Sequence, residues 1–427
     1  MFKKDINANE NYLAKFITIE NIKKHPDADR LQVLSVDGNT LIVNLDYKEG
    51  DTCVYFPVES SINSELIAYA NLFQDISKNK NPEQPGGFFT ASCRVKPLKL
   101  RGIPTQGFLL PVPLFFDWLS SKGYTFEIPY QLPSIEFSHF NDIELLKKYQ
   151  ILKENQGSTK YPDGLVDGHF SLHSSTPSFY KNYKKFKLDD HIDISVKLHG
   201  TSAVFSKTLV ENKLSLWQKL LKLLGANLLT RSYQFIYTSR STFRNGHNFK
   251  YIGQDVYGVT AQKIKHHLHD GMTIYGEIVG YKPAGAFVQK HYDYGCNVNQ
   301  SDFYIYRITT TTPSGLVVEW DEKRINDYAY PLGLKVVPNL YSGTVENLIK
   351  DKLTSDSDVS EVFLETIKDS FLEQSEPLCV NKVPREGVVI RKRTTSLEVY
   401  KAKSFAFLML ETAALDAGEV DMESADS

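Results

Sequence analysis

The first 110 or so residues alternate short apolar runs with polar turns, a pattern that leaves few folds open. Runs rich in β-branched and aromatic residues occur at positions 16–22, 31–36, 40–44 and 52–56, with a DGN turn at 37–39 and a KEGD loop at 48–51. A helical stretch at 65–73 and extended runs at 95–100 and 107–112 follow. About five strands and one helix predict a small antiparallel β-barrel, and a five-stranded OB fold is the most economical form.

Length and charge bound the rest of the chain. The 427 residues, 41% of them hydrophobic, suffice for two or three domains. The formal net charge of -2 gives no sign of a polyanionic partner, but it conceals an acidic end: residues 411–427 hold six of the 51 acidic residues and no basic one. We expect that end to be a solvated tail.

The sequence contains no apolar run of the signal-peptide or membrane-span type. It therefore predicts a soluble, cytoplasmic protein, or one of the host cytoplasm if it is viral, with no membrane partner and as a monomer. The four cysteines, Cys53, Cys93, Cys296 and Cys379, form no CxxC pair. We interpret them as reduced thiols rather than zinc ligands or disulfides.

Two stretches are locally basic. Residues 94–102 (RVKPLKLRG) contain four cations, and residues 179–187 (FYKNYKKFK) interleave lysines with aromatic rings. Phosphates require cations and bases require flat apolar faces, so both stretches suit binding to RNA. A solvated protein face backed by aromatic residues of the core would explain the same two stretches equally simply. The candidates for RNA contact are Arg94, Lys96, Lys99, Arg101, Lys184 and Lys185.

The composition divides the chain into an OB-like domain at 1–118, a connector at 119–170 with one short helix at 143–152, a larger α+β domain of antiparallel sheets with flanking helices at 171–410, and the acidic tail at 411–427. In the third part, residues 214–229 predict an amphipathic helix with Trp217, Leu220 and Leu224 on one face, opposite Lys219 and Lys222. It is too short to span a bilayer, and packing on the domain is favoured over membrane or partner docking.

The sequence VKLHGTS, residues 196–202, places Lys197 at the end of an apolar strand and just before a tight turn. A lysine is a good nucleophile only when neutral, and its ordinary pKa is about 10.4. Nearby cations or a bound metal disfavour the ammonium form, at about 1.4 kcal/mol per pKa unit. Other positive groups should therefore point at the same spot.

Residues 385–404 supply them in a predicted hairpin. Lys401 and Lys403 share a face of one strand. A turn centred between Thr394 and Thr395 would set Glu386 against Lys403, and Val388 against Lys401. That would give one carboxylate suited to a metal or its water and two cations suited to phosphate.

Three further candidates lie on the strands between. Glu277 is the single acid in an apolar strand at 272–281, where it needs a partner such as a ribose hydroxyl or a metal-bound water. Tyr304 and Tyr306 share a face in an aromatic strand and suit stacking on a base. Arg240, in YTSRSTFRNG, could reach a phosphate.

The chain contains, in this order, KxHGTS, SR, YGE, an aromatic YR strand, EGVVIR and KAK. This ordered set resembles the motifs of the covalent nucleotidyltransferase superfamily, over about residues 174–410. The histidine at position 199 resembles RNA ligases more than DNA ligases or capping enzymes. Those two groups carry an OB domain after the lysine pair, whereas only 24 residues follow Lys403 here. The whole chain is similar to ATP-dependent RNA ligases with an N-terminal OB domain.

The resemblance implies a role for each motif residue. It makes Lys197 the nucleophile that becomes lysyl-AMP, Glu386 the ligand of Mg²⁺ or Mn²⁺, and Lys401 and Lys403 the α-phosphate contacts. Glu277 would contact the ribose or a second metal. Further implied positions are Gly200 and Arg240 in nucleotide binding, Tyr306 stacked on adenine, and His199 assisting pyrophosphate release or the RNA steps.

The implied substrates are ATP and RNA ends, a 3′-hydroxyl and a 5′-phosphate, at a nick in a duplex. No GxxxxGK[ST] loop is present, so a separate end-healing kinase or phosphatase would prepare damaged ends. Two alternatives remain: a DNA ligase or guanylyltransferase, and a catalytically silent RNA-binding protein that keeps the fold.

Overall fold

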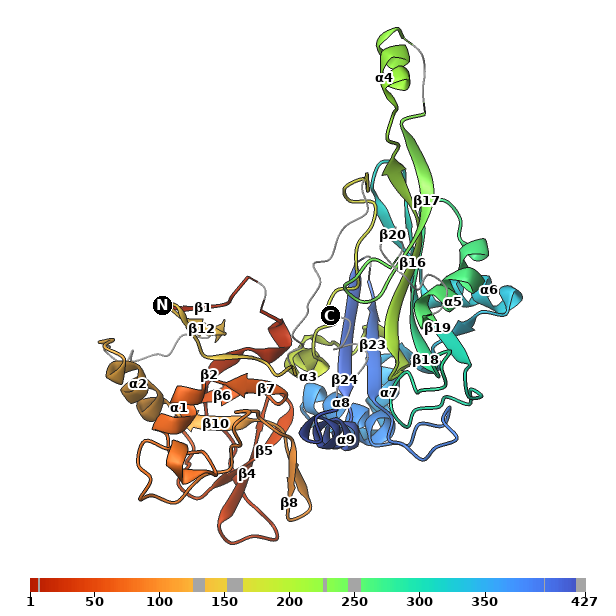
Figure 1. Cartoon of the computed structure of the whole chain (residues 1–427). Helices are drawn as coiled ribbons and strands as arrows, with labels where there is room; N and C mark the ends of the chain where they lie inside the picture. Colours follow the sequence, from red (N-terminus) through yellow and green to blue (C-terminus); the bar gives the residue numbers. More distant parts are fainter. Residues whose placement is uncertain are drawn as a thin grey trace.

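The computed structural model describes residues 1–6, 8–125, 135–151, 164–225, 229–244, 255–394 and 396–419. Figure 1 shows two parts side by side, an N-terminal part in red and orange and a larger part in green to blue. The prediction of an OB-like barrel followed by an α+β domain is confirmed in outline. Residues 31–36 and 52–56 are strands over the predicted residues.

The N-terminal part is built from short antiparallel strands. Its main sheet has the order β10-β6-β2-β11, beside a β3-β4-β5 sheet and a β8-β9 hairpin. The elements are β1 (Phe2–Lys3), β2 (Ala14–Thr18), β3 (Lys23–Lys24), β4 (Leu31–Val36), β5 (Asn39–Asn44), β6 (Thr52–Phe56), β7 (Ser60–Ile62), α1 (Ser64–Tyr69), β8 (Leu98–Leu100), β9 (Ile103–Thr105), β10 (Phe108–Pro111), α2 (Val112–Ser121), β11 (Glu136–Phe137), β12 (His139–Phe140), β13 (Ile143–Glu144) and β14 (Leu146–Lys148).

The predicted short helix at 143–152 is wrong. Residues 143–148 form β13 and β14 instead, and β14 pairs with β7, with Leu146 opposite Ile62. Leu145 and Leu146 are buried in the core of the N-terminal part. Pairing with β7, a strand far earlier in the chain, outweighs the weak helical pattern of this segment, because strand formation depends on such distant partners.

The C-terminal part consists of two antiparallel sheets, β22-β15-β23-β24 and β17-β16-β18-β19-β20, the latter with a short parallel strand β21. Helices α5 and α6 pack on the larger sheet, and α3, α7 and α8 pack on the smaller one. The elements are α3 (Phe179–Asn182), β15 (His191–Lys197), β16 (Thr201–Glu211), α4 (Leu216–Leu223), β17 (Arg231–Thr238), α5 (Val256–Ile264), β18 (Met272–Gly280), β19 (Ser301–Thr311), β20 (Val317–Glu319), α6 (Glu322–Ala329), β21 (Lys335–Val336), β22 (Asn339–Thr344), α7 (Val345–Ile349), α8 (Val359–Ile367), β23 (Gly387–Arg393), β24 (Leu397–Lys403) and α9 (Phe405–Asp416).

The C-terminal helix α9 joins the two parts. Buried Arg94 of the N-terminal part donates to the carbonyl oxygen of Thr412, at 3.2 Å, and to Asp416 Oδ1, at 2.9 Å. Lys96 also pairs with Asp416. The predicted solvated tail therefore differs over residues 411–416, which belong to α9, where Asp416 meets Arg94 and Lys96 and Glu411 meets Lys403. Residues 420–427 lie outside the described residues.

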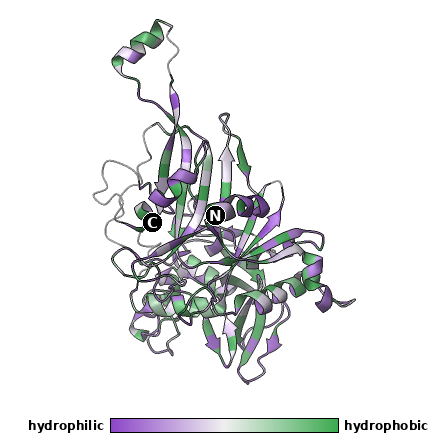
Figure 2. Cartoon of the chain, turned by 90° about the vertical axis from the view of Figure 1, so that its right-hand side faces the viewer, coloured by the Kyte–Doolittle hydropathy of each residue, from purple (hydrophilic) through white to green (hydrophobic). Residues whose placement is uncertain are grey.

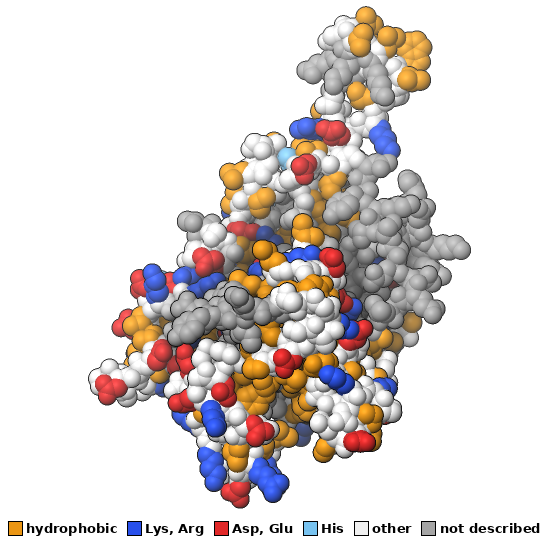
Figure 3. All heavy atoms as spheres, turned by 90° about the vertical axis from the view of Figure 1, so that its left-hand side faces the viewer, with side chains coloured by type: hydrophobic (Ala, Val, Ile, Leu, Met, Phe, Trp, Pro, Cys, Tyr) orange, Lys and Arg blue, Asp and Glu red, His pale blue; other side chains and the backbone are white. Residues whose placement is uncertain are grey.

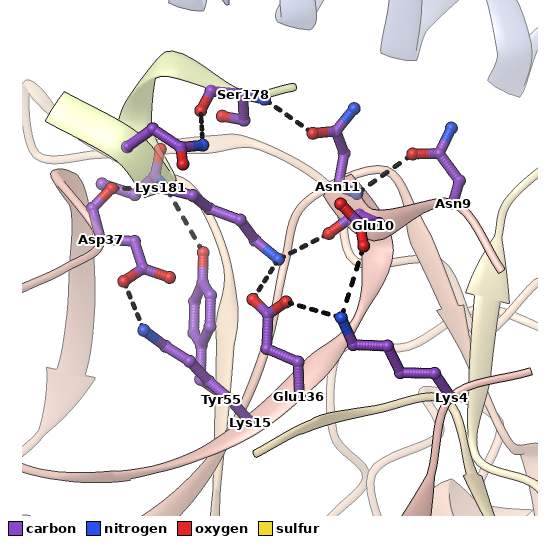
Figure 4. A network of polar contacts seen from close by, with 12 residues as sticks. Lys4, Asn9, Glu10, Asn11, Lys15, Asp37, Tyr55, Glu136, Ser178 and Lys181 are labelled. Carbon is purple, nitrogen blue, oxygen red and sulfur yellow. Dashed lines mark hydrogen bonds and ion pairs between the residues drawn. The ribbon is translucent and has the colours of Figure 1, made fainter. Parts of the chain in front are cut away.

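A second contact between the parts surrounds Lys181 of α3 (Figure 4). Its ammonium lies 2.7 Å from Glu136 Oε1 and donates to the carbonyl oxygen of Glu10. Asn11 accepts from the Ser178 backbone N–H at 2.7 Å. These contacts fix the chain that leads into β15 against the N-terminal part.

The amphipathic helix at 214–229 is shorter than predicted and does not pack on the domain. Helix α4 sits at the end of the long β16–β17 hairpin, away from both parts (Figure 1). Leu216, Trp217 and Leu223 are 85%, 76% and 88% exposed. The prediction failed because apolar periodicity shows which face of a helix is apolar but not what covers it.

None of the helices in the described part of the chain is long and apolar enough to cross a membrane.

Candidate active site

A cavity of about 860 Å³ opens between the two sheets of the C-terminal part and the N-terminal part. Its volume is in the range of small-molecule sites. Most of the predicted site residues line it, together with the segment 173–177 and Tyr12 of the N-terminal part. The predicted residues on its walls are Lys197, His199, Arg240, Glu277, Tyr306, Glu386, Lys401 and Lys403.

Lys197 is the last residue of β15, as the sequence predicts, and its side chain is 26% exposed. Its Nζ lies 2.5 Å from Oε1 of Glu386, whose side chain is 5% exposed. The contact follows from strand pairing, since Lys197 lies opposite Gly387 in the β15–β23 ladder. A Cβ at position 387 would lie 2.0 Å from the Ala402 carbonyl oxygen, so only glycine permits this close pairing.

The turn after Lys197 is held tightly. A Cβ at Gly200 would lie 2.3 Å from the Ile278 carbonyl oxygen, which explains the glycine. The Gly200 carbonyl oxygen accepts from Gln289 Nε2 at 2.7 Å. The His199 ring is edge-on between the rings of Tyr292 and Phe407, each with a centroid distance of 4.8 Å. These contacts fix the direction of the lysine and of the histidine.

The predicted register of the final hairpin is wrong by one residue. Lys401 lies opposite Val389, and Lys403 opposite Gly387. The strands end at Arg393 and begin again at Leu397, so the connection has an odd number of residues, and the prediction assumed an even one; Thr395 itself lies outside the described residues. Glu386 still reaches the cavity from the position just before β23.

Lys401 is a buried cation in this cavity. Burial, followed by the positive charges of Lys403 and Lys197, lowers the pKa of Lys401 to about 8. Lys401 and Lys197 are therefore like charges in one cavity. This is the cluster of cations that the sequence predicts beside the nucleophilic lysine.

Lys403 connects three parts of the chain. Its Nζ lies 2.8 Å from Oε1 of Glu59, in the N-terminal part, and 2.9 Å from Oε2 of Glu411, in α9. These two carboxylates hold the pKa of Lys403 well above its ordinary value, against the effect of burial. In this arrangement Lys403 is bound by carboxylates.

The two carboxylates titrate as a pair. Burial, and after it the charge of Glu59, raises the pKa of Glu411 to about 7, although Lys403 acts in the opposite direction. Burial also disfavours ionisation of Glu59, but Lys403 outweighs burial and lowers the Glu59 pKa to about 2. Near neutral pH the group therefore carries a second carboxylate that is close to its protonation midpoint.

Of the two tyrosines predicted to share a face, only Tyr306 is among the residues lining the cavity. Its hydroxyl lies 3.1 Å from Ser202 Oγ and 3.3 Å from His173 Nδ1. Tyr304 is buried in the core between the sheets. The β18–β19 ladder shifts register between Tyr275 and Gly276, leaving Tyr306 as an extra residue, and such a bulge reverses the alternation of faces.

Glu277 lies in β18 and Arg240 just after β17, the two strands on either side of β16. Glu277 lies opposite Ser202 in the β16–β18 ladder, next to the turn that follows Lys197. Arg240 follows β17 and donates to Ser175 Oγ at 3.3 Å. Both therefore reach the cavity wall as the sequence predicts.

The candidates for RNA contact divide into two groups. Lys99, Arg101, Lys184 and Lys185 are exposed. Arg94 is buried, and both Arg94 and Lys96 are occupied by Asp416. The rings of Phe179, Tyr180, Tyr183 and Phe186 are buried in the core beside α8, so the idea that they stack on RNA bases is wrong.

The carboxylate of Glu386 suits a divalent cation. Its Oε1 contacts Lys197, whereas its buried Oε2 has no hydrogen-bond partner among the residues that the structure describes. A buried carboxylate oxygen without a donor is unfavourable, and a hard cation such as Mg²⁺ or Mn²⁺, or its bound water, would satisfy it. The residues present therefore fit the predicted metal.

Sequence reasoning missed Glu411, Tyr12, His173 and the segment 174–177, which also line the cavity, and Glu59, which pairs with the cavity residue Lys403. Glu59 and Tyr12 belong to the N-terminal part, and no local pattern shows that this part closes over the site. Glu411 was assigned to a tail. The one usable signal was Glu411 eight residues after Lys403, within a helical apolar run.

Two protein-family models match the chain, one in each part. A model described as RNA ligase matches residues 190–403, and a model described as an OB-fold domain matches residues 13–112. A search of curated proteins gives no match.

Among solved structures, Naegleria gruberi RNA ligase with PPi has a TM-score of 0.55 and 18% identity, covering 94% of this chain and 99% of that one. Variants of the same ligase, one with ATP and Mn and one with AMP and Mn, each give a TM-score of 0.56 at 18% identity, over 93% of this chain and 98% of theirs. At this identity the likeness shows a shared fold.

The raised pKa of Glu411 predicts a pH dependence of stability. Because the folded-state pKa is raised from 4.5 to about 7, the contribution of this group to the free energy of unfolding is fully present below about pH 4.5 and is lost as the pH rises through about 7. Glu411→Gln should lack that loss, which is on the order of 1 to 3 kcal/mol. Urea unfolding of both proteins between pH 4 and 9 measures the difference.

Glu365→Gln, on the exposed side of α8, is the matched control and should follow the wild type across this range. A constant difference between wild type and Glu411→Gln at all pH values would contradict the shared titration at Lys403.

Proposed function

We propose, from the premise that this chain belongs to the RNA ligase family, that it uses ATP to join an RNA 3′-hydroxyl to a 5′-phosphate, at nicks in a duplex. The observation that carries the proposal is the contact of 2.5 Å between Lys197 and Glu386, in a cavity that also contains Lys401. ATP and Mn are bound by the Naegleria ligase of the same fold, which supports ATP and Mg²⁺ or Mn²⁺ for this chain.

In the first step, Nζ of Lys197 attacks the α-phosphorus of ATP. A nitrogen–phosphorus bond forms, the bond to the bridging oxygen breaks, and pyrophosphate leaves, so that AMP becomes joined to the lysine. The amine must be neutral when it attacks, so its proton has to leave first. Lys401 also balances the negative charge on the α-phosphate oxygens in the transition state.

Two further displacements at phosphorus complete the reaction. The RNA 5′-phosphate oxygen attacks the AMP phosphorus and releases Lys197. The 3′-hydroxyl then attacks the 5′-phosphate, and AMP leaves as the strand is sealed. Positioning and charge balance contribute most to such reactions. Lys403 would join Lys401 on the phosphate only after exchanging at least one of its carboxylates.

The remaining cavity residues have positioning roles in this proposal. Tyr306, whose hydroxyl is anchored on Ser202, would stack on adenine. Glu277 would hold the ribose or a second metal ion, and Arg240 a phosphate. His199, held edge-on by two rings and 3.9 Å from Glu386 Oε2, would assist pyrophosphate release or the RNA steps.

The divalent cation would be held by Glu386, through its unpaired Oε2 or a water, with Glu277 as a second ligand. When bound, it would supply positive charge to the triphosphate. On the RNA side, the exposed cations Lys99, Arg101, Lys184 and Lys185 are the contacts we retain. An end-healing kinase or phosphatase would supply the 5′-phosphate.

The nucleotide step predicts a labelled protein. Incubation with α-labelled ATP should label the wild type, whereas GTP and NAD⁺ should not. Lys197→Ala should lose the label entirely, since it removes the proposed attacking amine. Glu386→Gln should reduce it by on the order of a hundredfold, as expected for losing one electrostatic contact in a preorganised site. Gel autoradiography measures each.

Lys207→Ala is the control, because Lys207 pairs with Asp270 on the outer part of the same sheet and should keep full labelling. If the wild type takes up no label from any nucleotide, the chain is a silent RNA-binding protein. Label from GTP instead would indicate a guanylyltransferase.

The proposed RNA substrate predicts that the protein distinguishes an RNA 3′-hydroxyl strand from a DNA one. A nicked duplex with an RNA 3′-hydroxyl strand should be sealed faster than one with a DNA 3′-hydroxyl strand, because a site that contacts a 2′-hydroxyl loses that contact on DNA. Single-turnover sealing of the two duplexes, with the same 5′-phosphate strand, measures the ratio. Equal rates would contradict selectivity for an RNA 3′-hydroxyl strand, and faster sealing of the DNA strand would favour a DNA ligase.

A further inference from the structure

The tip of the β16–β17 hairpin presents apolar side chains to solvent. Its exposed apolar residues are Leu216, Trp217, Leu220, Leu221, Leu223, Leu224 and Leu229. Figure 3 shows hydrophobic side chains gathered on this tip, and Figure 2 shows the helix there with apolar and polar residues in alternation. A cluster of exposed leucines and a tryptophan on one short segment is unfavourable in water and marks an interaction surface.

The apolar residues occupy one side of the helix. At about 100° per residue, positions 216, 217, 220, 221, 223 and 224 cover an arc of about 160°. Positions 218, 219 and 222, a glutamine and two lysines, fall on the remaining arc. The backbone N–H of Leu224 donates to the Leu220 carbonyl oxygen at 3.0 Å, so the helical turn continues through this face.

The charge of the tip has one sign. Residues 212–230 contain three lysines, Lys213, Lys219 and Lys222, and no acid. Glu211, at the base, pairs with Arg231 on the facing strand. The sequence of the segment beyond this ion pair is therefore basic, and its complement is an anionic surface.

We propose that the tip is an interfacial anchor that binds an anionic lipid surface. A single short helix with leucine and tryptophan on one face and lysines on the other is the arrangement that inserts at the boundary between headgroups and acyl chains. The tip protrudes from both parts, so a flat surface reaches it without meeting them (Figure 1). This departs from the sequence-based expectation of no membrane partner.

Other occupants fit less well. A standard protein interface uses roughly 20 to 30 residues from each partner, more than this tip provides to a second copy or another protein. Binding to single-stranded RNA uses several aromatic rings, whereas the described part of the tip has Trp217 alone. Three positive charges next to a continuous apolar face favour lipid over both.

The anchor would determine where the active-site cavity is held. Strand β16 runs from the tip to Thr201, four residues after Lys197. Binding at the tip would hold the ligase at a surface without touching the cavity, and RNA ends located there would be its substrates.

The test is flotation of the full chain with vesicles of phosphatidylcholine alone and of phosphatidylcholine with roughly one-third phosphatidylserine. Wild type should float with the anionic vesicles, and much less with the neutral ones. The variant Trp217→Ser/Leu220→Ser/Leu224→Ser should lose at least about tenfold in partitioning. Lys213→Gln/Lys219→Gln/Lys222→Gln should bind the anionic vesicles no better than the neutral ones.

The matched control replaces three exposed apolar residues elsewhere, Leu316→Ser/Tyr330→Ser/Val380→Ser, and should float as wild type does. Circular dichroism and nucleotide labelling verify that each variant is folded, since the tip is remote from the cavity. Three results would overturn the proposal: no flotation of the wild type, equal loss in the control, or a dimer in sedimentation that the Trp217 variant abolishes while vesicles bind neither protein.

Discussion

The antiparallel pairing of β15 with β23 brings the end of one strand against the start of the other, and the cavity depends on this pairing. It sets Lys197 opposite Gly387 and leaves the Glu386 carboxylate 2.5 Å from the lysine amine. Gly387 allows the close approach, and Gly200 allows the turn that follows the lysine. A nucleophile, a carboxylate and a buried cation are thereby brought together by the pairing of β15, β23 and β24.

Lys403 links the cavity to the contact between the N-terminal and C-terminal parts. The N-terminal Glu59 and the α9 residue Glu411 bind its ammonium, and Arg94 ties the same helix to the N-terminal part. A phosphate arriving at Lys403 would compete with these carboxylates, so substrate binding and the contact between the parts are coupled through one charge. The net charge of -2 does not reflect a shortage of basic residues, because 49 basic side chains are balanced by 51 acidic ones and several of them form ion pairs.

The sequence predicted most of the site because its residues lie next to strand ends and glycines with local signatures: Lys197, Glu277, Glu386 and Lys401 all reach the cavity. The sequence-based prediction failed where the local structure depends on residues far away in the chain. Strand β14 depends on β7, Asp416 meets cations of the N-terminal part, and a bulge turns Tyr304 into the core. Residue preferences also do not determine the exact length of a turn, and the strand register depends on that length.

Peptide mapping by mass spectrometry after incubation with ATP and Mg²⁺ tests the central claim most directly. The account predicts a single AMP adduct, on the peptide that carries Lys197, and its removal when pyrophosphate is added, because the first step is reversible. An adduct on Lys401 or Lys403, or an unmodified Lys197 peptide in protein that still seals RNA, would contradict it.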